Sequence, residues 1–127
     1  MKLTHNFLLA EFESNDGAPT PPQVLTNLQK VANALQTLRM VLNTPIQINS
    51  GYRSPAHNAR VGGSPNSQHL KGNAADIVAL GYMPDFVADT IERLIKEGNM
   101  PEGGLGRYDN FTHYDIRGTK ARWDNRT

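Results

Sequence analysis

The chain has 127 residues, no cysteine, and 13 basic against 12 acidic side chains. Its length is typical of one domain with a single core, so residues 1–127 are predicted to form one domain. The lack of cysteine excludes disulfides, thiolate metal sites and cysteine nucleophiles, and any metal must therefore be held by histidine or carboxylate. The near-neutral charge argues against nucleic acid as a partner.

The sequence contains no segment typical of a membrane span or a signal peptide. No run approaches the roughly 20 apolar residues of a membrane span. The apolar stretch within residues 3–12 is interrupted by polar residues, whereas a signal peptide needs about 7–15 apolar residues and a cleavage site. We therefore expect the protein to be made in the cytoplasm and to reach any external substrate by release or another export route. We also expect it to be a monomer.

The first half of the chain is predicted to contain a short element, a loop and one long helix. Residues 3–12 form a strand or a turn, and Thr20 before two prolines resembles a helix N-cap. From Gln23 to Leu42, apolar residues recur every three or four positions, which is typical of a helix packed against the core. This stripe consists of Val24, Leu28, Val31, Leu35, Leu38 and Leu42.

Short strands and a second helix are predicted in the rest of the chain. The predicted elements are a strand at 46–48, a loop at 49–68, a strand at 74–80, a helix at 85–97, and strands at 103–108 and 111–116. The apolar face of the second helix consists of Phe86, Ile91, Leu94 and Ile95. Asp109-Asn110 is the predicted turn, and the tail from Gly118 is polar. This order of elements predicts an α+β fold, a small antiparallel sheet flanked by helices.

Two of the four histidines lie near carboxylates in the predicted strands. His69 precedes the strand at 74–80, and Asp76 lies inside it among apolar neighbours, where a carboxylate must be paired, hydrogen-bonded or bound to a metal. His113 and Asp115 project from one face of their strand. Two histidines and a carboxylate with an open fourth position are a common catalytic zinc set. A buried Asp–His pair without metal would also fit.

Four sequence blocks follow one another along the chain: Ser50-Gly51-Tyr52-Arg53-Ser54-Pro55, Ser67-x-His69-x-x-Gly72-x-Ala74-x-Asp76, Gly103-Gly104-Leu105-Gly106-Arg107-Tyr108 and His113-x-Asp115. In this order they resemble the zinc D-Ala-D-Ala carboxypeptidase family of peptidoglycan peptidases, which includes many phage endolysins. The matching region runs from about Ile46 to Trp123, most of the chain. The resemblance implies the fold shared by these peptidases and the Hedgehog signalling domain.

The resemblance also implies roles for individual residues. The implied zinc ligands are His69, Asp76 and His113. Arg53 is implied to bind a substrate carboxylate or to steady the developing oxyanion, roles that suit its planar guanidinium. Ser67 and Gln68, beside the first ligand, either donate hydrogen bonds to the substrate or only shape the loop.

The catalytic base is the point at which this sequence departs from better-known members. Several of them have Glu or Asp three residues before the last histidine ligand, but Asn110 occupies that position here and cannot ionise. We favour Asp115 as the base or, with about equal weight, as a carboxylate that orients the zinc site. Asp109, in the predicted turn, is the other candidate.

The predicted activity is zinc-dependent hydrolysis of a peptide bond in the peptidoglycan stem peptide, as a carboxypeptidase or an endopeptidase. The small size and the lack of a signal peptide resemble a phage or prophage endolysin that acts on the cell wall after release. The alternative is a non-catalytic, zinc-containing module of the same fold that binds cell wall or protein.

The remaining histidines and several aromatic residues lie outside the predicted zinc site. His5 and His57 match no ligand position of the family, and His5 is expected at the surface. Tyr114 is expected in the core, on the strand face opposite His113. Three other aromatic residues either line a substrate groove or pack over the edge of the sheet: Tyr52, Tyr108 and Trp123.

Overall fold

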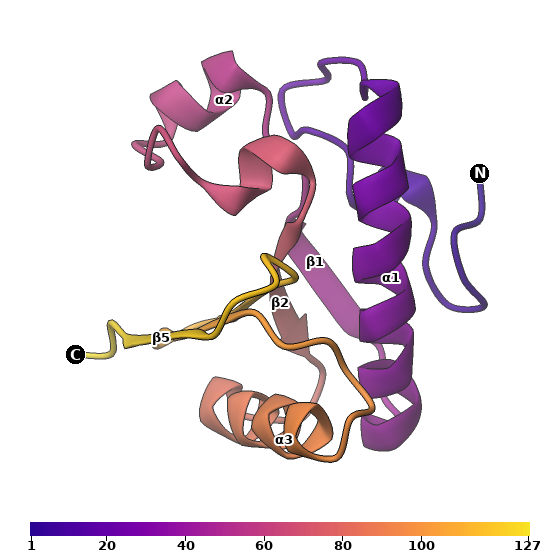
Figure 1. Cartoon of the computed structure of the whole chain (residues 1–127), viewed down its shortest axis with the longest axis vertical. Helices are drawn as coiled ribbons and strands as arrows, with labels where there is room; N and C mark the ends of the chain where they lie inside the picture. Colours follow the sequence, from indigo (N-terminus) through magenta and orange to yellow (C-terminus); the bar gives the residue numbers. More distant parts are fainter.

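A five-stranded sheet flanked by helices forms the centre of the computed structural model, which describes residues 1–127 (Figure 1). The strands are β1 (Ile46–Ser50), β2 (Ala74–Ala79), β3 (Gly104–Arg107), β4 (Thr112–Asp115) and β5 (Ala121–Asp124). They lie in the order β1-β2-β4-β3-β5. Neighbouring strands are antiparallel except for β3 and β5, which are parallel. The α+β class is confirmed, with a mixed rather than purely antiparallel sheet.

The predicted long helix is confirmed as α1 (Pro22–Leu42), and all six residues of its apolar stripe are buried. The predicted N-cap is wrong, because Pro21 occupies the cap position. The hydroxyl oxygen of Thr20 is instead buried without a hydrogen-bond partner. The helix ends at Asn43, whose left-handed backbone turns the chain towards β1.

The second predicted helix is confirmed as α3 (Pro84–Lys96), but its apolar face includes Val87 rather than Phe86. Val87, Ile91 and Leu94 recur at helical spacing and face the core. Phe86 is 51% exposed and stacks on Tyr82, with ring centroids 5.2 Å apart. The prediction failed there because apolar character alone does not fix which of two adjacent residues faces the sheet.

Two segments that we predicted to be irregular contain regular structure. The predicted loop at 49–68 contains α2 (Pro55–Arg60) and leads into the 3-10 helix η2 (Gln68–Lys71). Ser54 caps α2 by accepting a hydrogen bond from the backbone of His57. The polar tail contains β5, and the N-terminal segment contains only the 3-10 helix η1 (Leu9–Glu11) and one isolated bridge. None of the helices has the length and apolarity needed to cross a membrane.

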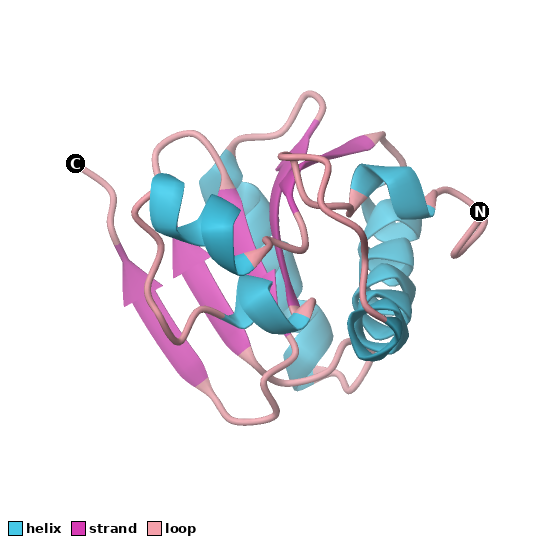
Figure 2. Ribbon diagram, turned by 90° about the horizontal axis from the view of Figure 1, so that it is seen from above, coloured by secondary structure: helices cyan, strands magenta, loops and turns pink.

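The long helices and the segment with α2 and η2 lie on different sides of the sheet. In Figure 1, α1 runs along the side of the sheet that carries β1 and β2, and α3 lies below the sheet. The segment with α2 and η2 lies on the opposite side, and Figure 2, seen from above, shows it in front of the strands. The apolar core therefore lies against α1 and α3, and η2 faces the polar side of the sheet.

A row of directly opposed residues crosses the whole sheet. Ser50 on β1 is opposite Asp76 on β2, and Asp76 is opposite His113 on β4. His113 is in turn opposite Gly106 on β3, and Gly106 is opposite Trp123 on β5. Opposed residues project from the same face of a sheet, so strand register alone brings Asp76 and His113 together.

Candidate metal centre

His69 is held in place by a short turn that is fixed at both ends. Ser67 precedes η2, and its hydroxyl accepts a hydrogen bond from the His69 backbone. Gly72 ends η2 with φ 74°, and a side chain there would meet the Val24 side chain at 2.7 Å, so only glycine suits the position. The His69 ring is buried, and its Nδ1 donates to the carbonyl oxygen of Gly51 at 2.7 Å.

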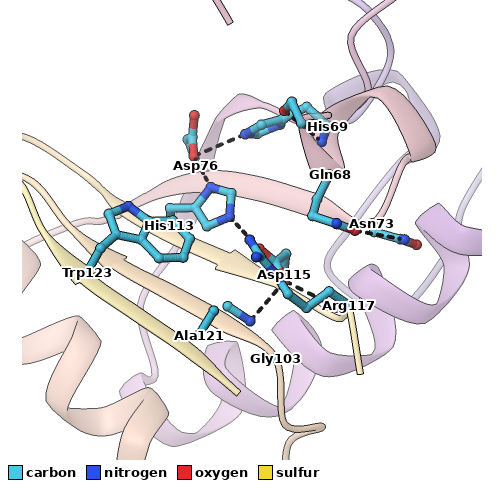
Figure 3. A network of polar contacts seen from close by, with 12 residues as sticks. Gln68, His69, Asn73, Asp76, Gly103, His113, Asp115, Arg117, Ala121 and Trp123 are labelled. Atoms are coloured by element: carbon cyan, nitrogen blue, oxygen red, sulfur yellow. Dashed lines mark hydrogen bonds and ion pairs between the residues drawn. The ribbon is translucent and has the colours of Figure 1, made fainter. Parts of the chain in front are cut away.

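Asp76 and the two histidines form one buried cluster (Figure 3). The Nδ1 atom of His113 lies 2.9 Å from Oδ1 of Asp76, and Nε2 of His69 lies 3.3 Å from the same oxygen. The two imidazole rings meet edge to face, with centroids 5.2 Å apart. One carboxylate oxygen therefore faces a nitrogen of each histidine.

The donor atoms of this cluster suit a metal ion. One ligand atom from each of His69, Asp76 and His113 lies within 4.8 Å of the other two, and all three residues are buried. Because Nδ1 of His69 donates to a carbonyl, Nε2 is the ring nitrogen left to face the Asp76 carboxylate. Two imidazoles with one carboxylate are donors that zinc prefers.

Arg53 lies at the edge of this cluster and lines the cleft above it. Its guanidinium donates to the Ser50 hydroxyl at 3.1 Å and to Oδ2 of Asp76 at 3.3 Å. A longer bond of 3.4 Å joins it to the side chain of Asn58 on α2. The structure thus places the predicted arginine beside the predicted metal ligands, where a substrate anion could reach it.

Asp115 lies behind His113 rather than in the cleft. Its side chain is fully buried, and Oδ2 accepts from Nε2 of His113 at 2.7 Å. The Arg117 guanidinium donates to both carboxylate oxygens, at 2.9 and 2.8 Å, and the Gly104 backbone donates to Oδ1 at 2.8 Å. Burial raises the pKa of Asp115, but the bonds from His113 and Arg117 outweigh burial and hold the pKa well below its usual range. This geometry suits a carboxylate that orients His113 and is poor for a base.

The other predicted site residues are divided between the cleft and the surface. Ser67 and Gln68 line the cleft; the Ser67 hydroxyl is engaged with His69, and the Gln68 side chain accepts from Asn73. Asp109 is exposed and binds Thr127 at the C-terminus, away from the cleft. Neither candidate base therefore faces the space above the cluster.

The cleft above the cluster has a volume of about 500 Å³ and two different walls. One wall is polar and comes from Arg53 and the segment 63–68; the other is aromatic. The aromatic wall consists of Tyr108, Phe111 and Trp123. The predicted role in a substrate groove thus suits Tyr108 and Trp123. Tyr52 is instead buried in the core, as is Tyr114. The histidines without a ligand role, His5 and His57, do not line the cleft.

Sequence reasoning missed Arg117 and Phe111 as cleft residues. Arg117 binds Asp115 and lies over the Trp123 ring, 5.4 Å from its centroid. The spacing of two residues from Asp115 was an available signal, because an arginine so near in the sequence can reach the carboxylate. No comparable signal marks Phe111, which reaches the cleft by stacking on Tyr108.

Substitution of Gly106 by alanine is expected to disturb the aromatic wall. An added Cβ would lie 2.4 Å from Cε2 and Nε1 of Trp123, so the indole must move. Overpacking of this kind costs about 1–3 kcal/mol, which chemical denaturation would measure. Gly62, whose Cβ would meet nothing within 4 Å, provides the control through Gly62→Asn, which keeps a residue tolerant of positive φ. Equal stability of the two variants would contradict the close contact.

Acid is expected to destabilise the metal-free protein. Burial raises the pKa of Asp76, but hydrogen bonds from His113 and His69 outweigh burial and depress it, as for Asp115. Carboxylates with depressed pKa contribute stability above their unfolded value, about 3.9, and lose it as the pH falls further. Urea unfolding with a chelator should show a lower free energy of unfolding at pH 2.5 than at pH 5. The decrease should be smaller in Asp115→Asn; an equal decrease would contradict the assignment.

Two buried histidines and a carboxylate at the floor of an open cleft form a candidate metal site with the donor set of catalytic zinc sites. The chain belongs to the peptidase M15 family, whose model matches residues 2–115. A stretch of 46 residues, 35% of this chain, is 46% identical to the zinc D-Ala-D-Ala carboxypeptidase of Streptomyces albus G. The match covers only 18% of the length of that protein. The family expected from the four sequence blocks is confirmed, and the comparisons indicate a metallopeptidase.

Proposed function

We propose that the chain is a zinc peptidase that hydrolyses a peptide bond of the peptidoglycan stem peptide, as a D-Ala-D-Ala carboxypeptidase or an endopeptidase. The observation that carries the proposal is the buried cluster of His69, Asp76 and His113, in which one ligand atom from each residue converges below an open cleft. The name of the similar Streptomyces protein supports both the metal and the substrate. We further propose that residues 1–127 act as one monomeric domain, as a phage or prophage endolysin would after release.

In the proposed mechanism, each side chain around the cluster has a separate task. Zinc, when bound, supplies a Lewis acid that polarises the scissile carbonyl and activates water. Asp115 accepts from Nε2 of His113 and thereby leaves Nδ1 of that ring facing Asp76. Arg53 binds a free carboxylate or the carbonyl oxygen of the substrate, for which its guanidinium is suited. Ser67 and Gln68 form part of the polar wall against which the substrate lies.

A non-catalytic module that binds cell wall or protein is the second candidate, and one observation favours it. Asp76 is the one carboxylate among the residues that line the cleft, and it is bound by two histidines and by Arg53. A peptidase usually positions a further proton acceptor near the attacking water. Zinc binding without hydrolysis would therefore be the outcome that supports the module.

Incubation of the purified protein with peptidoglycan separates the two candidates. The zinc-loaded protein should release new fragments that are absent after chelation and restored by added zinc. Fragment masses would identify the scissile bond, because a carboxypeptidase releases D-Ala and an endopeptidase divides the stem or cross-link. Zinc-loaded protein that binds peptidoglycan without new fragments would contradict the peptidase and support the module.

A further inference from the structure

The Tyr108 side chain is fixed in the aromatic wall of the cleft. Its ring stacks on Phe111, with centroids 4.3 Å apart and ring planes inclined by 12°. Its hydroxyl oxygen lies 2.8 Å from the indole nitrogen of Trp123. The Trp123 ring in turn lies over Gly106 and 5.0 Å from the His113 ring, between centroids. The Tyr108 hydroxyl is therefore held at a defined place in the aromatic wall of the cleft.

The direction of the bond between Trp123 and Tyr108 determines where the hydroxyl hydrogen can point. An indole nitrogen can only donate, so the Tyr108 oxygen must be the acceptor. The hydrogen of that hydroxyl must then find a different acceptor. Tyr82 and Tyr114 donate theirs to the backbone carbonyls of Leu42 and Pro101. No protein acceptor takes the Tyr108 hydrogen, and the residue lines the cleft.

We propose that Tyr108 is a catalytic residue whose hydroxyl donates a hydrogen bond to the oxygen of the scissile carbonyl as negative charge develops there. The inference rests on the proposed peptidase function. The hydroxyl keeps its proton throughout, and no covalent bond to Tyr108 forms or breaks. Because Phe111 and Trp123 already fix its position, the donor needs no reorganisation when the charge develops, which is the condition for strong stabilisation. Arg53, on the opposite wall, remains available for a substrate carboxylate.

The variant Tyr108→Phe tests this role, because it removes the hydroxyl and leaves the stacked ring. We expect kcat to fall about 100-fold, as when one oxyanion donor is lost, with KM and zinc content nearly unchanged. The matched control is Tyr82→Phe, which removes a hydroxyl that binds the end of α1, and it should retain wild-type kcat. The substrates are a stem pentapeptide ending in D-Ala-D-Ala and a purified cross-linked muropeptide dimer.

A double-mutant cycle separates direct action from support of Trp123. If the hydroxyl only anchored the indole, Trp123→Phe would reproduce the loss, and adding Tyr108→Phe would have no further effect. We expect Tyr108→Phe to lower kcat at least about tenfold further in the Trp123→Phe background.

The outcomes distinguish this inference from the proposed function. Unchanged kcat in Tyr108→Phe, or a raised KM with full kcat, would overturn the role of Tyr108 while the peptidase stands. No cleavage of either substrate by the zinc-loaded wild-type protein would overturn both.

Discussion

Replacement of His69 by alanine is expected to abolish stoichiometric zinc binding and to lower kcat/KM by about 1000-fold or more. The substitution removes one of the three donors that converge in the cluster. A metal ion contributes several kcal/mol to a transition state of this kind, and each 1.36 kcal/mol corresponds to a factor of ten in rate. Metal analysis of the purified variant and the release of peptidoglycan fragments would measure the two effects.

His57→Ala is the matched control for His69→Ala. His57 lies on α2, partly exposed, and does not line the cleft. Its removal should leave zinc content and hydrolysis close to the wild-type values. If His69→Ala still bound one zinc ion per chain, the assignment of His69 as a ligand would be wrong, whatever the activity of the variant.

Replacement of Asp115 by alanine is expected to have the largest effect on stability, a loss of about 3 kcal/mol. The fully buried carboxylate accepts hydrogen bonds from His113, Arg117 and the Gly104 backbone. Without it, a buried backbone N–H group loses its partner and the Arg117 charge loses its counter-ion, both of which are costly. Unfolding in urea, monitored by the fluorescence of Trp123, would measure the change in the free energy of unfolding.

The milder Asp115→Asn variant tests the role of this carboxylate in the metal site. The amide can still bond to Nε2 of His113, but it removes the charge that sets the orientation and basicity of the ring. We expect zinc affinity to fall by about 10- to 100-fold, the usual effect of losing such a carboxylate. The control Asp109→Asn changes an exposed carboxylate and should leave the zinc affinity unchanged. If Asp115→Asn lost hydrolysis while its zinc affinity stayed wild-type, Asp115 would act as the base instead.

The sequence located the cluster of His69, Asp76 and His113 better than the cleft around it. These candidate ligands could be recognised because the motif around His69 is local and Asp76 is a carboxylate in an apolar strand. The environment of Asp115 could not, because it depends on Gly104, which the pairing of β3 with β4 brings to the carboxylate. Whether Asp115 acts as a base or orients His113 depends on how exposed its side chain is. Neighbouring residues in the sequence do not determine that exposure.

The same limit explains the missed elements of the fold. The stripe of α1 could be recognised because helical periodicity is a local property. The strand β5 has only four residues, and it pairs in parallel with β3 across a connection that the sequence pattern does not reveal. The aromatic residues were ambiguous for this reason: Trp123 reaches the cleft through β5, whereas Tyr52 turns into the core.

The row of opposed residues from Ser50 to Trp123 also bears on how the sheet assembles. A slip of one residue would exchange the faces of β2 or β4 and bring Ala75 or Tyr114, now paired in the core, into the cleft. Such a misaligned sheet would separate the donors of the cluster, so it could not hold the ion. Zinc that binds only the correct alignment stabilises that alignment by mass action. A bound metal would thus favour the native strand pairing over a slipped one.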